Sequence, residues 1–167
     1  MSHTAEELLQ KSAEGDVESM GILGETYLHG NKGLEVDYRL AYKWSKKAAD
    51  MGYVRSYTNL GIMYMEGSYV KRDTAYACEL FTRAMDKGDM KAPRYIGLMY
   101  KTGKLSSDKP DEEAVRFFTI GAKNGDITSQ FYLGEMYEKG IGVKEDMDEA
   151  IKWYRKSAER GDKIAKQ

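Results

Sequence analysis

The feature that most constrains this chain is a motif that recurs every 36–37 residues. One glycine register has intervals of 37, 36, 37 and 36 residues: Gly15, Gly52, Gly88, Gly125 and Gly161. A second motif, Leu/Ile-Gly-x-x-Tyr-x-x-Gly, occurs four times, with its tyrosines at Tyr27, Tyr64, Tyr100 and Tyr137. A period of this length indicates a repeat architecture, in which each copy packs against its neighbours.

Each copy contains two segments whose apolar residues recur at three- and four-residue steps, which predicts two amphipathic helices. No stretch long enough to form a strand alternates apolar and polar residues with period two, so the sequence predicts an all-α fold. The glycine that follows each second helix predicts a left-handed C-terminal residue. The aspartates directly after four of these glycines are predicted N-caps of the next helix: Asp16, Asp89, Asp126 and Asp162.

The periodicity predicts one solenoid domain over residues 1–167. We expect its four repeats at approximately residues 16–52, 53–88, 89–125 and 126–161. Residues 4–14 resemble a lone second helix and are expected to form a partial capping helix. Residues 162–167 are expected to form a C-terminal tail that begins another first helix.

A glycine in the middle of each first helix predicts close helix packing. Glycine costs about 1 kcal/mol relative to alanine in a helix interior. Its recurrence at one register indicates that no side chain fits there: Gly24, Gly61, Gly97 and Gly134. We expect the alanines of the second helices to form the opposite surface: Ala41, Ala77, Ala114 and Ala150.

These motifs resemble the Sel-one-like repeat family, a branch of the tetratricopeptide-type helical repeats. The fourth copy matches best, with Leu133-Gly134, Tyr137, Gly140, Ala150 and Trp153-Tyr154. The resemblance implies a right-handed α-solenoid whose first helices line a concave surface, and an adaptor or scaffold that binds a protein or peptide there. Secreted bacterial members carry a cysteine pair in each repeat, which this chain lacks.

Composition limits the partners and the compartment. The 26 basic and 27 acidic residues give a net charge of -1, which favours neither nucleic acid nor an acidic membrane as a partner. No apolar stretch approaches a membrane span, and the polar N-terminus lacks the pattern of a signal peptide. The single cysteine, Cys78, favours a reducing compartment. We therefore expect a cytoplasmic monomer, or a periplasmic or secreted one if a signal peptide was removed.

The side of each first helix opposite the glycine motif predicts a binding stripe. The mixture of aromatic, apolar and charged groups there suits peptide recognition. The candidate peptide-binding residues are Arg55, Asn59, Ile62, Lys91, Arg94, Tyr95, Leu98, Tyr132 and Glu135.

Three kinds of contact are expected from these residues, each with a structural alternative. Asn59 can both donate to and accept from a peptide backbone, and tetratricopeptide-type domains use an Asn in this way; the alternative is a solvent-facing polar residue. Arg55, Lys91 and Arg94 could pair with a partner's carboxylate, or be ordinary surface charges. The tyrosines of the stripe serve either as anchors or as half-buried packing residues.

No catalytic constellation is found, and we predict no enzyme activity, no cofactor and no metal site. His3 and His29 lack neighbours at metal-ligand spacing. Cys78 is interpreted as a core residue rather than a nucleophile, and Gly140-Ile141-Gly142 as a repeat turn without the lysine of a phosphate loop. The alternative function is that of secreted bacterial relatives linked to small-ligand binding or weak, β-lactamase-like hydrolysis.

Overall fold

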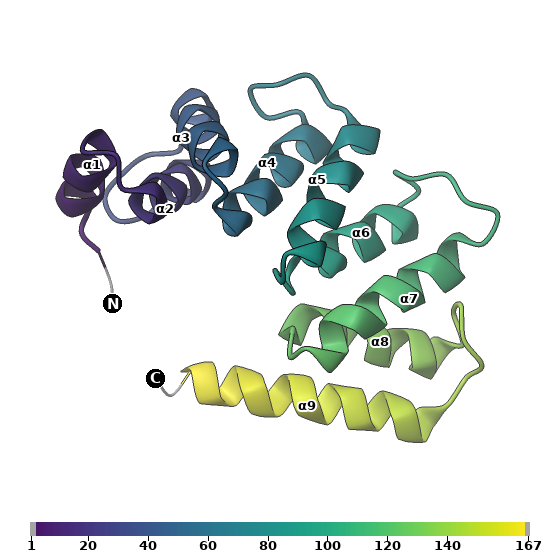
Figure 1. Ribbon diagram of the computed structural model, residues 1–167. Helices are drawn as coiled ribbons and strands as arrows, with labels where there is room; N and C mark the ends of the chain where they lie inside the picture. Colours follow the sequence, from purple (N-terminus) through teal and green to yellow (C-terminus); the bar gives the residue numbers. More distant parts are fainter. Residues whose placement is uncertain (1–2, 166–167) are drawn as a thin grey trace. The chain divides into compact units, whose positions relative to one another are not determined.

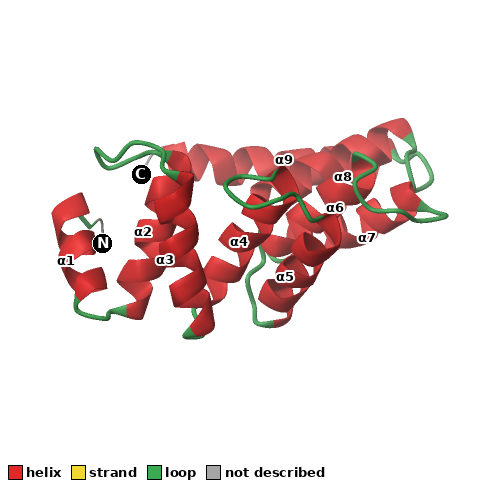
Figure 2. Ribbon diagram, turned by 90° about the horizontal axis from the view of Figure 1, so that it is seen from above, coloured by secondary structure: helices red, strands yellow, loops and turns green. Residues whose placement is uncertain are grey.

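The computed structural model of the chain describes residues 3–165, and in this range it contains only α-helices and connecting loops (Figures 1 and 2). The all-α repeat fold predicted from the sequence is therefore confirmed. The helices are α1 (Ala5–Ala13), α2 (Val17–His29), α3 (Tyr38–Asp50), α4 (Val54–Glu66), α5 (Thr74–Asp86), α6 (Ala92–Lys101), α7 (Pro110–Lys123), α8 (Ile127–Lys139) and α9 (Met147–Ala165).

The helices group into two compact units, Met1–Asp89 and Met90–Gln167. In the first unit α1 packs on α2, α2 on α3, and α4 on both α3 and α5. In the second unit α7 packs on α6 and α8, and α8 packs on α9. Each second helix is thus paired with the first helix of its own repeat. The expectation that residues 1–167 form a single domain stays a prediction.

Two of the four predicted Gly-Asp caps are confirmed. Asp16 accepts a hydrogen bond from the Ser19 amide at 3.1 Å, and Asp126 accepts one from the Ser129 amide at 3.0 Å. Asp89 does not cap, because α6 begins only at Ala92 with a proline in its first turn. Asp89 instead accepts a hydrogen bond from the Thr58 hydroxyl at 2.7 Å. This bond connects α4 to the turn that follows α5.

The predicted stop at Gly161 is wrong, and so is the separate tail at 162–165. Helix α9 continues through Gly161 and Asp162 to Ala165, and residues 166 and 167 lie outside the described range. At three earlier Gly turns, the first helix of the next repeat packs against the helix that precedes the turn (α1–α2, α3–α4 and α7–α8). Gly161 does not take a positive φ, so it does not form the left-handed C-terminal residue on which the predicted stop rested.

The central glycines of the first helices lie against side chains of the second helices. A Cβ atom at Gly97 would lie 2.8 Å from the Phe118 ring, and one at Gly61 would lie 2.6 Å from the Phe81 ring. Both rings are fully buried. The expected alanine partner contributes only a backbone oxygen, 3.2 Å from a Cβ atom at Gly24 and 3.3 Å from one at Gly134. Close approach is therefore confirmed, but the opposite surface is filled mainly by a ring in the last three repeats and by Ser45 in the first, rather than by an alanine side chain.

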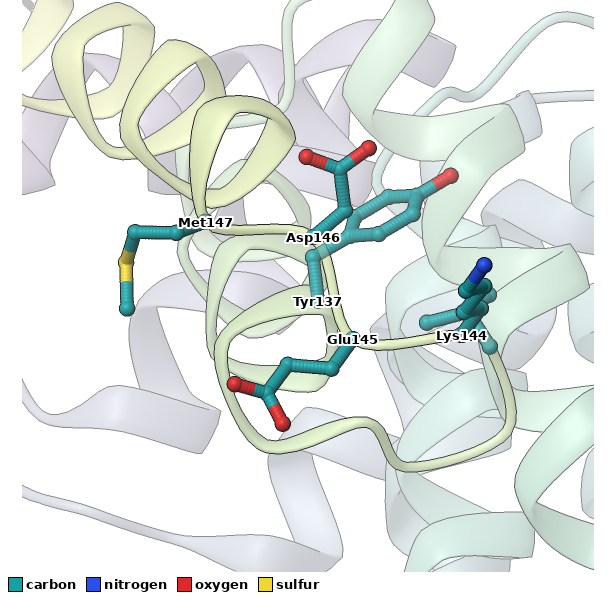
Figure 3. Close-up of a pocket in the computed structure, with 6 residues that line it drawn as sticks. Tyr137, Lys144, Glu145, Asp146 and Met147 are labelled. Atoms are coloured by element: carbon teal, nitrogen blue, oxygen red, sulfur yellow. The ribbon is translucent and has the colours of Figure 1, made fainter.

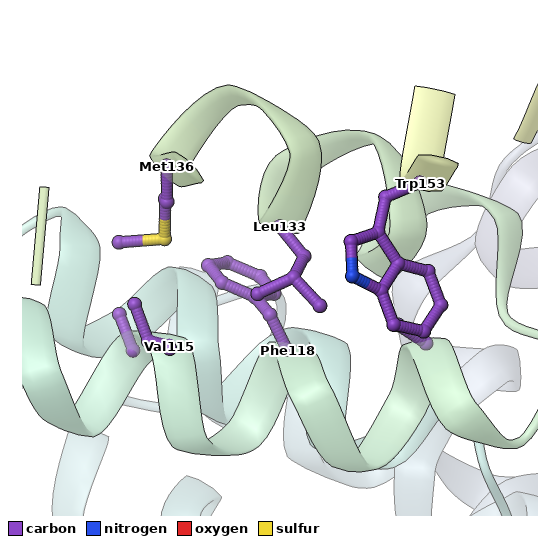
Figure 4. Close-up of a cluster of buried hydrophobic side chains, with 7 residues drawn as sticks. Val115, Phe118, Leu133, Met136 and Trp153 are labelled. Atoms are coloured by element: carbon purple, nitrogen blue, oxygen red, sulfur yellow. The ribbon is translucent and has the colours of Figure 1, made fainter. Parts of the chain in front are cut away.

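The core of the second unit is built around Phe118 (Figure 4). In Figure 4 the Phe118 and Leu133 side chains meet between Met136 and Trp153, with Val115 beside them. Among the described residues of the first unit, one cluster lies around Ala41 and Met63 and another around Leu60 and Leu80. These clusters fix the first helices of each unit against their second helices.

The glycine contact predicts a large difference between two leucine substitutions. Gly97→Leu would force a side chain into the Phe118 ring and should lower the free energy of unfolding by at least about 2 kcal/mol. Lys123→Leu, at an exposed position of α7, should change it by less than about 0.5 kcal/mol. Urea unfolding followed by circular dichroism measures both, and equal values would show that the packed face has been misplaced.

Candidate functional site

In the first unit the predicted stripe runs along α2 and α4, which contact each other. The guanidinium of Arg55 on α4 forms an ion pair with Glu25 on α2 at 2.7 Å. The two side chains are 50% and 31% exposed, so the pair contributes only about 0–1 kcal/mol to stability. A carboxylate from a partner could therefore replace Glu25 at small cost.

Asn59, the stripe residue predicted to bind a peptide backbone, is buried rather than solvent-exposed. It is 6% exposed, and its amide nitrogen Nδ2 has no hydrogen-bond partner in the described chain. A buried donor without an acceptor costs about 1–3 kcal/mol, because it has lost its hydrogen bond to water. Its solvent-facing alternative is wrong, and the role of Asn59 in peptide binding stays a prediction.

Ile62, one turn further along α4, is shared between the stripe and the core. Its side chain is half-buried and packs against the cluster of Leu28, Ala41 and Met63. Only the outer part of the side chain is therefore available to a partner.

In the second unit Arg94 is held inside the protein. Its guanidinium donates two hydrogen bonds to the Asp126 carboxylate, one of them from Nε at 3.1 Å. Asp126 also caps α8 through Ser129. The two charged side chains are 21% and 5% exposed. Arg94 thus links α6 to the start of α8, and two of its five N–H donors are taken up by Asp126.

The environment of Asp126 keeps its carboxyl group ionised. Burial raises its pKa, but the hydrogen bonds from Arg94 and Ser129 outweigh burial, so the pKa lies below its ordinary value. The pair therefore contributes stability at neutral pH, which is lost as the pH falls through the lowered pKa.

Lys91 and Tyr95 lie at the start of α6. Lys91 is exposed at the N-cap position, where its side chain does not cap the helix. Tyr95 is half-buried, and the guanidinium carbon of Arg94 lies 5.6 Å from the centre of its ring. Tyr95 is therefore partly engaged by its own neighbour on α6.

Leu98, Tyr132 and Glu135 come together along α6 and α8. Leu98 and Tyr132 pack against the Phe118 core, with the Tyr132 ring stacked on Phe118 at 5.1 Å. The Nζ atom of Lys101 lies 5.6 Å from the centre of the Tyr132 ring and 4.0 Å from the Oε1 atom of Glu135. Lys101 was not singled out by the sequence, although it follows Leu98 by one helical turn. This surface combines an aromatic ring with one charge of each sign.

The loop after each of two first helices forms an open pocket that sequence reasoning missed. In the fourth repeat the pocket holds about 630 Å³ and is lined by Tyr137, Val143, Lys144, Glu145, Asp146 and Met147. Figure 3 shows the Lys144 and Glu145 side chains pointing away from each other. The pocket at the same register of the second repeat holds about 700 Å³ and is lined by Tyr64, Val70, Lys71, Arg72, Asp73, Thr74 and Ala75.

The described residues offer little for metal or thiol chemistry. No group of three or more His, Cys, Asp or Glu side chains in residues 3–165 is arranged to hold a metal ion. Burial raises the pKa of the Cys78 thiol, although a hydrogen bond with Thr82 opposes this, so the reactive thiolate is disfavoured. Among the same residues, no helix has the length and apolarity needed to cross a membrane.

The chain belongs to the Sel1 repeat family. The family pattern matches four consecutive segments, residues 17–53, 54–89, 94–126 and 127–162. This confirms the resemblance inferred from the glycine and tyrosine registers. The third match begins late, at the proline-containing start of α6.

Two relatives with assigned roles are similar over most of this chain. The rat DAP3-binding cell death enhancer 1 is 29% identical over 78% of the chain and 33% of its own length. The chitin synthase regulator SKT5 of Saccharomyces cerevisiae is 34% identical over 77% of the chain and 19% of its own length. The chain thus spans a third or less of these proteins.

Solved structures show the same fold. A protective antigen of uropathogenic Escherichia coli with an SLR fold has a TM-score of 0.78 and 34% identity, covering 96% of this chain and 34% of its own. A Sel1 repeat protein from Oxalobacter formigenes has a TM-score of 0.81 and 29% identity, covering 93% and 61%.

The Arg94–Asp126 pair predicts a pH-dependent stability difference. Arg94→Met would leave the Asp126 carboxylate buried without its cation and should lower the free energy of unfolding by about 3 kcal/mol at pH 7. The deficit should shrink with acid, because protonation of Asp126 removes the unpaired charge in the variant and the ion pair in the native protein.

Urea unfolding of both proteins between pH 3 and pH 7 measures this difference. Arg116→Met, at an exposed position of α7, is the matched control and should show little loss at any pH. A deficit in Arg94→Met that did not change with pH would show that only packing had been lost.

Proposed function

We propose that this chain is a protein-interaction scaffold whose first helices bind an extended segment of a partner protein. The observation that carries the proposal is the buried Asn59 amide, which has a donor without an acceptor. A backbone carbonyl of a bound segment would supply that acceptor and recover the hydrogen bond that the free protein lacks.

The burial of Asn59 defines how binding would occur. Since the amide is 6% exposed, the side chains around it would have to open slightly to admit a peptide. Such rotamer changes are common at interfaces and leave the backbone in place. Arg55, one turn before Asn59 on α4, would exchange Glu25 for a carboxylate of the ligand.

The surface of α6 and α8 would contribute a second contact area. Tyr132 supplies an anchor that is already held by Phe118, so little side-chain entropy would be lost on binding. Leu98 adds apolar area, and Glu135 with Lys101 adds charge of both signs. Lys91 and Tyr95 flank this area at the start of α6. Arg94 is left out of the contact set, because its charge is already paired with the buried Asp126 carboxylate.

The relatives support the class of function rather than a particular partner. The rat relative is named for binding DAP3, and the yeast relative is named as a regulator of chitin synthase. Both names describe proteins that act on other proteins. We infer the same mode of action here, in a cytoplasmic protein that is monomeric by itself and binds proteins rather than nucleic acid.

The Asn59 donor gives a direct test of partner binding. Asn59→Ala should weaken binding of a partner isolated from source extract by at least about tenfold, since the buried hydrogen bond is lost. Asn31→Ala, at an exposed loop position, is the matched control and should bind as the native protein does. Both variants should melt within a few degrees of the native protein.

Isothermal titration with the isolated partner measures the affinities. Unchanged affinity in Asn59→Ala would rule out the role of this amide. A protein that captures no partner at all from the extract would count against the scaffold function itself.

The absence of catalysis stays a prediction, with hydrolysis of β-lactams as its alternative. We expect no turnover of a nitrocefin-type substrate above the buffer rate, because the sequence offers no nucleophile–base pair. Absorbance during an overnight incubation measures this, and clear turnover by pure protein would favour the enzyme alternative.

A further inference from the structure

The loop between α4 and α5 contains a tyrosine in an unfavourable backbone conformation. Tyr69 has φ 68°, in the left-handed region that favours glycine, and its side chain is 59% exposed. At the same register of the fourth repeat stands Gly142, with φ 71°. The second repeat therefore keeps the turn but replaces its glycine with an exposed aromatic side chain. Strain of this kind is often found at binding sites.

Tyr69 is the outermost member of a cluster of tyrosines. Its ring lies 5.6 Å from that of Tyr42 on α3. The Tyr42 and Tyr64 hydroxyl groups are 3.3 Å apart, and the Tyr64 ring meets Tyr76 edge-on at 4.7 Å. These contacts hold the inner rings in place, so that a partner would meet a preformed aromatic surface.

Two cationic side chains adjoin this cluster. Lys71 and Arg72 are exposed, and they line the pocket of about 700 Å³ together with Tyr64 and Val70. Neither side chain forms an ion pair within residues 3–165. Asp73, the acidic residue of the pocket, accepts a hydrogen bond from the Tyr76 amide at 2.9 Å as the N-cap of α5.

We propose that Tyr42, Tyr64, Tyr69, Lys71 and Arg72 form a docking patch for an acidic peptide segment that carries an apolar or aromatic anchor. Glutamate or aspartate side chains of the segment would pair with Lys71 and Arg72, the latter in bidentate geometry. The anchor would pack on the exposed Tyr69 ring and Val70. This patch is separate from the stripe on the first helices, so it is independent of the function proposed above.

The comparison within the chain argues for an acidic occupant. The pocket of the fourth repeat has Glu145 where this one has Arg72, and the loop beside it has Gly142 at the register of Tyr69. The shared loop geometry therefore requires neither the Arg72 nor the Tyr69 side chain. The Tyr64 phenol stays neutral and adds no negative charge, since its hydrogen bond with Tyr42 and its burial raise its pKa to about 12.

The experiment is a titration of the isotopically labelled full chain with a synthetic peptide, followed by NMR. The probe is a capped peptide of a Leu-Phe pair flanked by three glutamates on each side. The matched probes are the same peptide with lysines in place of the glutamates, and an RNA of eight nucleotides. We expect the acidic peptide to shift the amide signals of residues 69–73 and Tyr42, and the basic peptide to leave them unchanged.

Three variants locate the binding. Tyr69→Gly should fold normally, because glycine suits φ 68°, and should bind the acidic peptide at least about tenfold more weakly. The double variant Lys71→Glu with Arg72→Glu should abolish binding. Lys144→Glu, at the same register of the fourth repeat, should bind as the native protein does.

The proposal is overturned if the acidic peptide causes no shifts, or if its shifts lie elsewhere. It is equally overturned if the basic peptide or the RNA binds as tightly, or if Tyr69→Gly binds normally. Asn59→Ala should leave this titration unchanged, so failure here and failure of the first-helix stripe can be told apart.

Discussion

The contact between a glycine of the first helix and a ring of the second helix is the constraint on which each of the last three repeats depends. Gly61 lies against Phe81, Gly97 against Phe118, and Gly134 against Tyr154. Because no Cβ atom intervenes, the two helices approach closely, and the large side chains fill the space that remains. This contact fixes which face of the first helix is buried. The opposite face is not bound by this contact, and its residues differ between the copies.

A second interaction couples successive repeats, and it changes from copy to copy. Gly21 is covered by the Tyr53 ring, Thr58 donates to Asp89, and Arg94 donates to Asp126. These residues occupy one register of the first helix and one register of the following turn. Phe131 stands at the same register of the fourth repeat and is 49% exposed. The contact between repeats is thus apolar at Gly21, a hydroxyl–carboxylate hydrogen bond at Thr58 and an ion pair at Arg94. By contrast, the glycine–ring packing within the last three repeats is nearly constant.

Much of the fold followed from local chemistry that is visible in the sequence. The period of 36–37 residues can be read directly from the sequence. The left-handed glycines and the caps at Asp16 and Asp126 depend only on residues a few positions away in the chain. The failures were at Asp89 and Gly161, where the outcome depends on what packs next. The candidate stripe stays a prediction, and the burial of Asn59 and the internal ion pair of Arg94 were not foreseen. Asp126 lies 32 residues from Arg94, so nothing local connects them.

The sequence by itself determined the family, the number of repeats and the packed face of each first helix, because a repeated spacing specifies these through local geometry. Only the tertiary structure decided which polar groups are satisfied and which remain open. Arg94 and Asp126 neutralise each other across two helices, whereas the amide of Asn59 is buried with its donor unpaired. Likewise, the strained turn at Tyr69 and the cations beside it become a surface only when α3, α4 and the loop after α4 are assembled. The physical reason is that hydrogen bonding and burial depend on distances between residues remote in the chain, which a repeat period does not encode.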